Sequence, residues 1–467
     1  VSQDNFKDYI TPILYFKRIS DVYDEETEAA LEESDGDAEY AALPEQHRFD
    51  IPEGCHWQDV RERNENLGAA IVGAMRKIEL ANPDTLYGVL SMFSAQKWTD
   101  KKNLSDGKIR DLIEHLSTRK LGNKNYPADL MGDAYEILLK KFADDSKAQA
   151  GEFYTPRSVV NLLVRILDPQ PGETVYDPAC GSGGMLIEAI QHMNHSSLCC
   201  GTIFGQEKNV VNSAIAKMNL FLHGASDFNI MQGDTLRSPK ILQNGEIAKF
   251  DCVIANPPFS LEKWGSTEWG SDKYGRNIWG TPSDSCADYA WIQHMVKSMA
   301  PGNGRMAVVM PQGVLFRGNE EGRIREKLVK SDLVEAIVTL GDKLFYGTGL
   351  SPCFMILRRL KPAAHSARVL MIDGTKILTA KRAQNILSPE DVDRLYELYC
   401  KYEDIEDFSK VVTIDDIAAK GYDLSPNKYV NYHKEEIRPY AEVLAEFKAA
   451  YEEVLKREAE FEKLINA

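Results

Sequence analysis

The chain has 467 residues, of which 43% are hydrophobic, and its formal net charge is −16. This length corresponds to about three domains, and the hydrophobic content supports a sizeable core and excludes wholesale disorder. A protein that binds nucleic acid without a partner usually has a net positive charge. If this chain binds nucleic acid, its basic surface is therefore local, or a partner subunit supplies the basic surface.

The first third of the chain is predicted to be helical. Apolar residues recur at spacings of three and four in residues 66–80, 106–117 and 129–142, which is the pattern of an amphipathic helix. We therefore expect a helical domain over residues 1–150.

From residue 174 onward, short apolar runs alternate with helical stretches. Seven such runs are expected to be strands: residues 174–176, 199–205, 229–231, 250–255, 305–310, 335–340 and 353–357. This alternation predicts an α/β fold with a doubly wound, mostly parallel sheet of seven strands. The last two runs are joined by a short glycine-rich connection, which indicates an antiparallel hairpin.

A polar helical region is predicted after residue 382. Its last segment carries a heptad-like stripe of mostly apolar residues: Tyr440, Leu444, Phe447, Tyr451, Val454, Glu458, Phe461 and Ile465. The stripe fits either a helix packed on its own domain or a coiled-coil arm for a partner subunit.

A glycine-rich turn links the first expected strand to a helix. It contains Asp177, Ala179, Gly181, Ser182 and Gly183. Glycine permits positive φ and lets a ligand approach the backbone. Leu186 stands where a dinucleotide-binding turn needs a third glycine, and no Gly-Lys-Ser/Thr phosphate loop occurs, so pyrophosphate binding is disfavoured.

Three acids end three successive expected strands, which suits a cationic ligand. Asp177 could face the ammonium and sulfonium of S-adenosylmethionine. Glu207 could accept both ribose hydroxyls with its two oxygens, and Asp234 could accept the adenine amine. Because ligands of doubly wound sheets lie beyond the strand ends, the set predicts an S-adenosylmethionine site.

The fourth strand runs into a motif that suits methylation of an exocyclic amine. The motif is Asn256-Pro257-Pro258-Phe259. The Asn256 side-chain oxygen and the Pro257 carbonyl would accept the two amine hydrogens and so free the nitrogen lone pair. Phe259 would stack on the base, which must leave the duplex to enter such a pocket. The methyl group would transfer directly, in line, with no covalent enzyme intermediate.

The motifs and their order along the chain resemble those of the modification subunit of type I restriction–modification systems. That subunit is an adenine-N6 DNA methyltransferase of the gamma amino-methyltransferase group. The turn and the Asn-Pro-Pro-Phe motif match that family, as do three further segments: Glu152-Phe153-Tyr154-Thr155-Pro156-Arg157 ahead of the turn, residues 130–136 and residues 422–430. The resemblance implies that Glu152, Phe153, Tyr154, Thr155, Pro156 and Arg157 line the cofactor pocket.

The resemblance also implies the domains and partners of the chain. Residues 151–382 would form the methyltransferase domain, and residues 383–467 a helical region with a partner-binding arm. Two copies would bind double-stranded DNA with one specificity subunit, which a nuclease–translocase subunit can join. Delegating the reading of DNA sequence to a partner fits the acidic charge of this chain.

No metal site and no membrane segment are expected. The eight cysteines form no C-x-x-C pair, which disfavours zinc and indicates free thiols in the cytoplasm. No signal peptide and no run of about 18 apolar residues is found. A basic run could contact phosphates, but interleaved acids favour an ordinary helix face. This run contains Arg317, Arg323, Arg325, Lys327 and Lys330.

Three other functions stay open at this stage. The Asn-Pro-Pro-aromatic motif also suits methyltransferases that act on protein glutamine or on RNA. A cytosine-N4 target involves the same amine chemistry. The third alternative is a cofactor-binding scaffold without activity, but a scaffold need not keep both the glycine turn and Asn256.

Overall fold

The computed structural model describes residues 7–86, 88–90, 98–102, 104–126, 155–194, 202–225, 227–345, 351–381, 384–433 and 440–465. Within it, the chain divides into two compact units, residues 1–430 and residues 431–467. No helix in the described part of the chain is long and apolar enough to cross a membrane.

The larger unit is built around a sheet with the strand order β11-β10-β8-β9-β7-β6-β1-β2-β3. The strands are β1 (Val175–Asp177), β2 (Ile203–Glu207), β3 (Phe228–Gln232), β6 (Cys252–Ala255), β7 (Arg305–Pro311), β8 (Val334–Leu340), β9 (Pro352–Arg358), β10 (Arg368–Gly374) and β11 (Ser409–Thr413). Two short strands, β4 (Leu242–Gln243) and β5 (Glu246–Ile247), form a separate hairpin.

The doubly wound α/β fold is confirmed. The hairpin is confirmed as well, because β9 runs antiparallel to β8 and lies between β8 and β7. Among the described residues the sheet has nine strands rather than the expected seven. Strand β10 extends it parallel to β8, and β11 adds an antiparallel edge. The sheet therefore continues beyond residue 382, although the sequence predicted only helices there.

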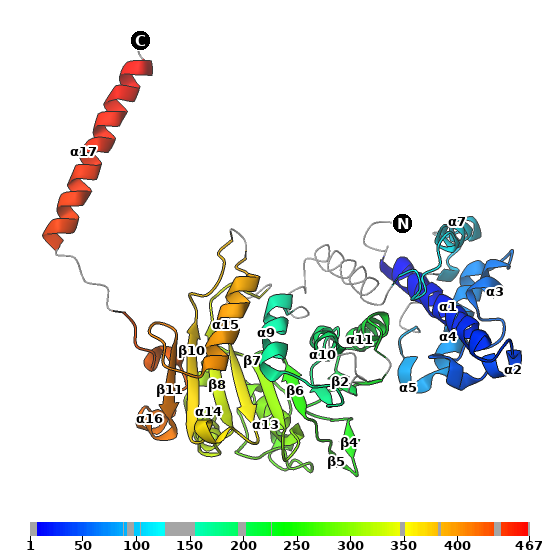
Figure 1. The fold of residues 1–467 in the computed structure, drawn as a ribbon, viewed down its shortest axis with the longest axis horizontal. Coiled ribbons are helices and arrows are strands. Elements are labelled where there is room, and N and C mark those ends of the chain that lie inside the picture. Colours follow the sequence, from blue (N-terminus) through cyan, green and yellow to red (C-terminus); the bar gives the residue numbers. More distant parts are fainter. Residues whose placement is uncertain are drawn as a thin grey trace. The chain divides into compact units, whose positions relative to one another are not determined.

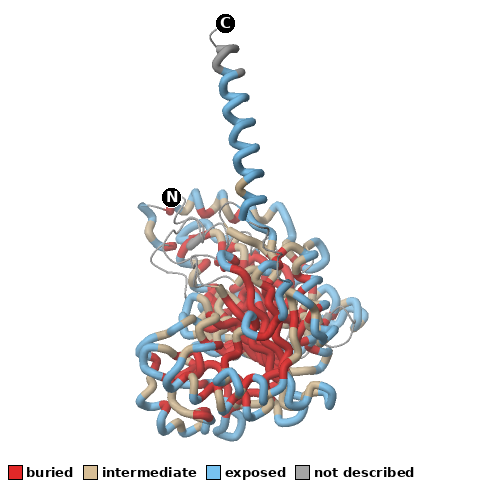
Figure 2. The backbone as a smooth tube through the Cα atoms, turned by 90° about the vertical axis from the view of Figure 1, so that its left-hand side faces the viewer, coloured by how far each residue is buried: buried red, intermediate tan, exposed pale blue. Residues whose placement is uncertain are grey.

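Helices cover both faces of the sheet (Figure 1). Successive strand residues alternate between two hydrophobic clusters: Ile254 and Ala307 belong to one, and Val253 and Val308 to the other. Residues of α9 (Arg157–Leu167), α10 (Gly184–Asn194), α11 (Val210–Leu222) and α15 (Pro389–Lys401) join the first cluster, and residues of α13 (Asp288–Ser298), α14 (Asn319–Lys330) and α16 (Ile414–Ala419) join the second. Because both faces are covered, the central strands are buried along their whole length, as Figure 2 shows.

The N-terminal helices form a third cluster, which includes the residues of α11 that do not face the sheet, among them Met218 and Phe221. The ring of Phe221 lies 5.5 Å from that of Tyr15 and 4.8 Å from that of Phe49. The helices are α1 (Lys7–Glu33), α2 (Ala38–Ala41), α3 (Trp57–Arg61), α4 (Leu67–Ala81), α5 (Pro83–Leu86) and α7 (Asp106–Ser117). The helices expected at 66–80 and 106–117 are thus confirmed, and the one expected at 129–142 lies outside the described residues.

In the described part of the smaller unit, the helix is α17 (Tyr440–Ile465). Most side chains of its stripe are exposed, with Tyr440 at 78%, Phe447 at 67% and Phe461 at 64%. Among the described residues, the other short helices all lie in the larger unit: α12 (Ser266–Trp269), η2 (Pro44–Gln46), η4 (Gln312–Leu315), η5 (Ala363–His365) and η6 (Pro426–Lys428).

Candidate active site at the carboxyl ends of the strands

The candidate residues gather where the strand order reverses. From β1 the chain proceeds through β2 to β3 on one side of the sheet, and β6 lies against β1 on the other side. All of these neighbours are parallel, so Asp177, Glu207 and Asn256 follow strands that end at one edge. This edge of a doubly wound sheet, at the switch point, is where its ligands bind.

The glycine turn lies directly over this edge. Gly181 and Gly183 have φ of 53° and 84°, which side chains rarely tolerate. A Cβ on Gly183 would lie 3.4 Å from Ala216 of α11, whereas the space beside Gly181 is open. The Ser182 carbonyl accepts a hydrogen bond from the buried Asn219 side chain of α11, with an N···O distance of 3.0 Å. The turn is therefore held against α11 and leaves room for a ligand at Gly181.

Two carboxyl groups lie beside the turn. Asp177 is buried and accepts the amide of Ala179 at 2.9 Å. Burial, reinforced by the charge of Glu207, raises the pKa of Asp177 to about 8. Glu207 accepts the amide of Gly181 at 3.0 Å and that of Asn209 at 2.7 Å. Burial also raises the pKa of Glu207, although these amide bonds oppose it.

The side chains of Asp234 and Gln206, near the ends of β3 and β2, make more contacts within the chain than the sequence suggested. The Asp234 carboxylate forms an ion pair with Lys208 at 2.9 Å and accepts the amide of Arg237 at 3.2 Å. Next to Glu207, the fully buried Gln206 donates to the Ser238 carbonyl and accepts the Lys240 amide. Gln206 could not be predicted from the sequence, because no motif marks a residue whose partners lie in another loop.

Asn256 follows β6 directly. Its Nδ2 donates to the Thr155 hydroxyl at 2.9 Å, and among the described residues its buried Oδ1 has no hydrogen-bond partner. A buried acceptor without a donor is costly, so its presence points to a missing donor. In the same motif, Pro257 is buried, Pro258 is exposed, and the partly buried Phe259 packs against the first hydrophobic cluster.

The segment ahead of α9 is only partly described. Glu152, Phe153 and Tyr154 lie outside the described residues. Thr155 contacts Asn256, Pro156 precedes the first residue of α9, and Arg157 begins the helix with an exposed side chain. A cofactor role for residues 152–157 therefore stays a prediction.

Of the basic residues in the run at 317–330, Arg323, Arg325, Lys327 and Lys330 lie on α14, whereas Arg317 precedes this helix. Arg325 is buried and donates to the backbone carbonyls of Tyr422 and Arg317. Lys327 bonds the Trp279 carbonyl, and Lys330 pairs with Glu326. Arg317 bonds acidic side chains. Arg317, Arg325, Lys327 and Lys330 therefore make contacts within the chain, whereas Arg323 is exposed.

The residues at this edge fit a cationic cofactor such as S-adenosylmethionine. Asp177 and Glu207 are adjacent acids, and in the described part of the chain neither forms an ion pair. A cationic ligand beside them would supply the missing positive charge. The open space at Gly181 and the free Oδ1 of Asn256 border the same edge, on β1 and β6.

Two family models match this chain. Residues 127–437 match the N-6 DNA methylase model, and residues 1–116 match the HsdM N-terminal domain. Together the two matches include both the helical domain and the edge that carries the candidate residues.

Named relatives are type I restriction enzyme methylase subunits. The MjaIX subunit of Methanocaldococcus jannaschii is 33% identical over 89% of this chain and 75% of its own length. The MjaVII subunit of the same organism is 37% identical over 65% of this chain, which spans 53% of that relative. The structure of the type I methyltransferase subunit from Streptococcus thermophilus superposes with a TM-score of 0.76 at 27% identity, over 92% of this chain and 95% of that one.

Proposed function

The chain belongs to the N-6 DNA methylase family of type I restriction enzyme methylase subunits, and we propose that Asn256 is the residue that activates its target amine. Enzymes of this family transfer a methyl group from S-adenosylmethionine to N6 of adenine in DNA.

The proposal is supported above all by the buried, unpartnered Oδ1 of Asn256. An adenine amine placed there would supply the donor that Oδ1 lacks, and the Pro257 carbonyl would accept its second hydrogen. Accepting both hydrogens favours a pyramidal nitrogen with an available lone pair. Phe259 would stack on the base, an interaction worth about 1–3 kcal/mol in related settings.

The cofactor is proposed to bind between the glycine turn and the acids. It supplies an electrophilic methyl group on a sulfonium. Asp177 would hold its ammonium, Glu207 its ribose hydroxyls, and Asp234 its adenine amine. Backbone groups from Ala179 to Gly183 would border the open space. By the family resemblance, Glu152, Phe153, Tyr154, Thr155, Pro156 and Arg157 are proposed to contribute to cofactor binding as well. Orientation of the two reactants is the main contribution of such a site to the rate.

The target adenine is proposed to leave the duplex, because its amine is paired inside the helix. The net charge of −16 disfavours independent DNA binding. We therefore propose that two copies of the chain bind DNA with one specificity subunit, to which a nuclease–translocase subunit can be added. The exposed stripe of α17 is the proposed contact with the specificity subunit.

The test uses the chain assembled with its specificity subunit. Asn256→Ala should abolish methylation of DNA, measured as N6-methyladenine by mass spectrometry, while S-adenosylmethionine binding persists. Asn303→Ala is the matched control, because Asn303 is exposed and bonds Asp251 at the opposite end of β6. Wild-type methylation by Asn256→Ala would refute the assignment. Methyl groups found on cytosine, RNA or protein would show that the target is different.

A further inference from the structure

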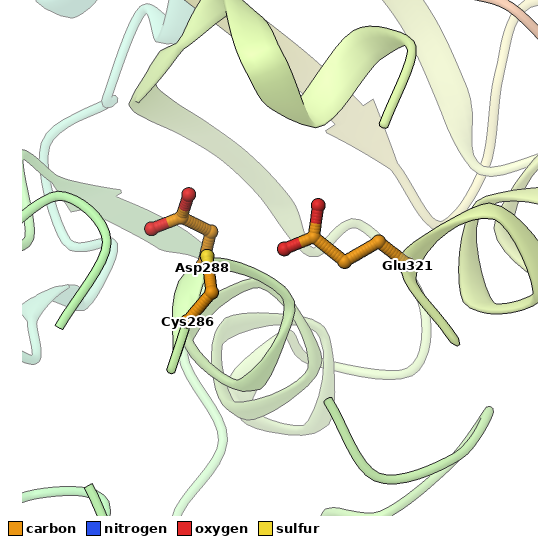
Figure 3. Close-up of side chains that lie close together, drawn as sticks. All are labelled: Cys286, Asp288 and Glu321. Carbon is orange, nitrogen blue, oxygen red and sulfur yellow. The ribbon is translucent and has the colours of Figure 1, made fainter. Parts of the chain in front are cut away.

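Four polar side chains meet between α13 and α14. We call Cys286, Asp288, Arg317 and Glu321 the Arg317 cluster. Figure 3 shows the Glu321 carboxylate directed toward Asp288 and Cys286, whose ligand atoms and its own lie within 4.8 Å of one another. Asp288 is fully buried, and Glu321 is 7% exposed.

The guanidinium of Arg317 supplies the positive charge in this cluster. Its Nη1 lies 2.8 Å from Asp288 Oδ2, 3.4 Å from Glu321 Oε1 and 3.1 Å from Cys286 Sγ. Burial acts to lower the pKa of Arg317, but the bond to Asp288 and the charge of Glu321 outweigh it and raise the pKa. The cluster therefore holds its own cation in the position that a metal ion would occupy.

Asp288 also holds the residue that follows the Asn-Pro-Pro-Phe motif. Its Oδ1 accepts the backbone amide of Ser260 at 2.7 Å, while its Oδ2 accepts Arg317. Arg317 Nη2 reaches the Ser260 hydroxyl at 3.4 Å. Ser260 has φ of 50°, a conformation that a non-glycine residue keeps only when its surroundings impose it.

Arg317 itself is fixed to the neighbouring strand. It follows β7 and η4, and β7 is the parallel neighbour of β6. Its backbone amide donates to the Gly313 carbonyl at 2.9 Å, and its carbonyl accepts Arg325 Nη1 at 2.7 Å. A Cβ on Gly313 would lie 2.4 Å from Arg317 Nε, so the side chain lies directly over this glycine. The end of β7 is thereby tied to the segment that leaves β6.

We propose that Arg317 and Asp288 are a positioning pair that fixes the Asn256–Phe259 segment relative to the cofactor and the target base. This inference rests on the proposed role of Asn256. Neither residue needs to touch substrate, because both act on the backbone at Ser260. Small misplacements of reacting groups reduce rates by about 100-fold, so the loss should fall on methyl transfer rather than on cofactor binding.

The test compares Arg317→Ala, Arg317→Lys and Asp288→Asn in the chain assembled with its specificity subunit. Three quantities are measured at saturating DNA: the single-turnover methylation rate, the Kd for S-adenosylmethionine, and the fluorescence of 2-aminopurine at the target position, which reports an extruded base. Arg323→Ala is the matched control, because Arg323 is an exposed arginine of the adjoining helix α14.

Arg317→Ala is expected to lower the single-turnover rate about 100-fold while the Kd stays within about twofold. It should also alter the 2-aminopurine signal. Arg317→Lys keeps the cation and should recover part of the rate, and Asp288→Asn should resemble Arg317→Ala. If Arg317→Ala fails to fold, the lysine and asparagine variants carry the test.

Rates within threefold of wild type for both Arg317→Ala and Asp288→Asn would overturn the inference. The inference would also be overturned if the variants lost cofactor affinity as strongly as methylation rate and also had a lower thermal midpoint. That combination would indicate only a structural role. Asn256→Ala in the same assay separates the two proposals: activity of that variant refutes the proposed function itself, whereas its inactivity beside fully active Arg317 variants refutes the positioning pair alone.

Discussion

Asn256 and Thr155, which are 101 residues apart in the chain, share a hydrogen bond of 2.9 Å between Nδ2 and Oγ1. Because the amide nitrogen donates to Thr155, the amide oxygen remains as the free, buried acceptor. Thr155 thus sets which atom of Asn256 faces the site. The family resemblance had assigned Thr155 to the cofactor pocket; the structure adds a contact with Asn256, the residue proposed to activate the amine.

The first prediction is that Thr155→Val lowers the methylation rate. Without the hydroxyl, the Asn256 amide can rotate and present a donor to the target amine. A net hydrogen bond contributes about 0.5–1.5 kcal/mol, so a fall of about 3- to 10-fold is expected at saturating cofactor. Thr155→Ser keeps the hydroxyl and should stay near the wild-type rate. Weaker cofactor binding by Thr155→Val with an unchanged rate would instead show that Thr155 acts in cofactor binding and not through Asn256.

The second prediction concerns the pH dependence of cofactor binding. With a pKa of about 8, Asp177 is mostly protonated in the free protein at pH 7. A cationic ligand favours the ionised form, so affinity for S-adenosylmethionine should rise by up to about tenfold per pH unit from pH 6 to 8. Glu207, whose pKa is also raised, acts in the same direction.

Calorimetry in buffers of different ionisation enthalpy checks this directly, because binding at pH 7 should release protons. Asp177→Asn should bind more weakly and with a flatter profile. Asp227→Asn is the control, since Asp227 is exposed and precedes β3 at the other edge. The same raised pKa means that the contribution of Asp177 to stability falls as the pH rises from 3.8 to about 8, so Asp177→Asn should raise the thermal midpoint at pH 8. Affinity independent of pH would contradict the assigned role.

The sequence predicted this edge well because its geometry follows from local patterns. Parallel strands end at a common edge, so acids and Asn256 placed directly after apolar runs come together in any doubly wound sheet. Strand β10 was missed. Its buried apolar run, Val369–Ile372, lies between charged residues and has the same pattern as the strands that were predicted. In β11 only Ser409 and Val412 are buried, so apolar content gave no comparable signal.

Long-range side-chain contacts could not be predicted in this way. Arg317 contacts Asp288 and Ser260 at separations of 29 and 57 residues, and neither partner belongs to a recognisable motif. From charge patterning alone, Arg317 looked like any other member of a mixed helix face. The Thr155–Asn256 bond is similar, since each residue belongs to a motif but nothing in either motif indicates that the two meet.

The third prediction is that Gly205→Ala destabilises the larger unit. A Cβ at Gly205 of β2 would lie 2.6 Å from Ile230 Cδ1, 3.0 Å from Cys180 Sγ and 3.1 Å from Leu186 Cδ1. Overpacking of this kind costs about 1–3 kcal/mol. Gly73→Ala is the control, since it meets nothing within 4 Å inside α4 and should be neutral or stabilising. Equal thermal midpoints for the two variants would show that the core near the turn is loosely packed.

The fourth prediction concerns the exposed stripe of α17. Phe447 and Tyr451 are 67% and 56% exposed and lie one turn apart, with ring centroids 6.4 Å from each other. If they anchor the specificity subunit, replacing both by serine should weaken association at least about 30-fold, because one buried aromatic anchor contributes about 2 kcal/mol or more. Sedimentation of the mixed subunits measures this.

The control for that prediction is Glu452→Ser with Lys456→Ser. These exposed residues lie on the side of α17 opposite the stripe, where a change to serine costs at least as much helix propensity as it does at the two aromatic positions. Neither pair should change the thermal midpoint of residues 1–430, because the described contacts divide the chain into two units at residue 430. If the aromatic pair leaves association unchanged while the opposite pair weakens it, the partner binds the polar side and the stripe has another role. Equal weakening by both pairs would mean that association depends on the helicity of α17 rather than on its apolar side.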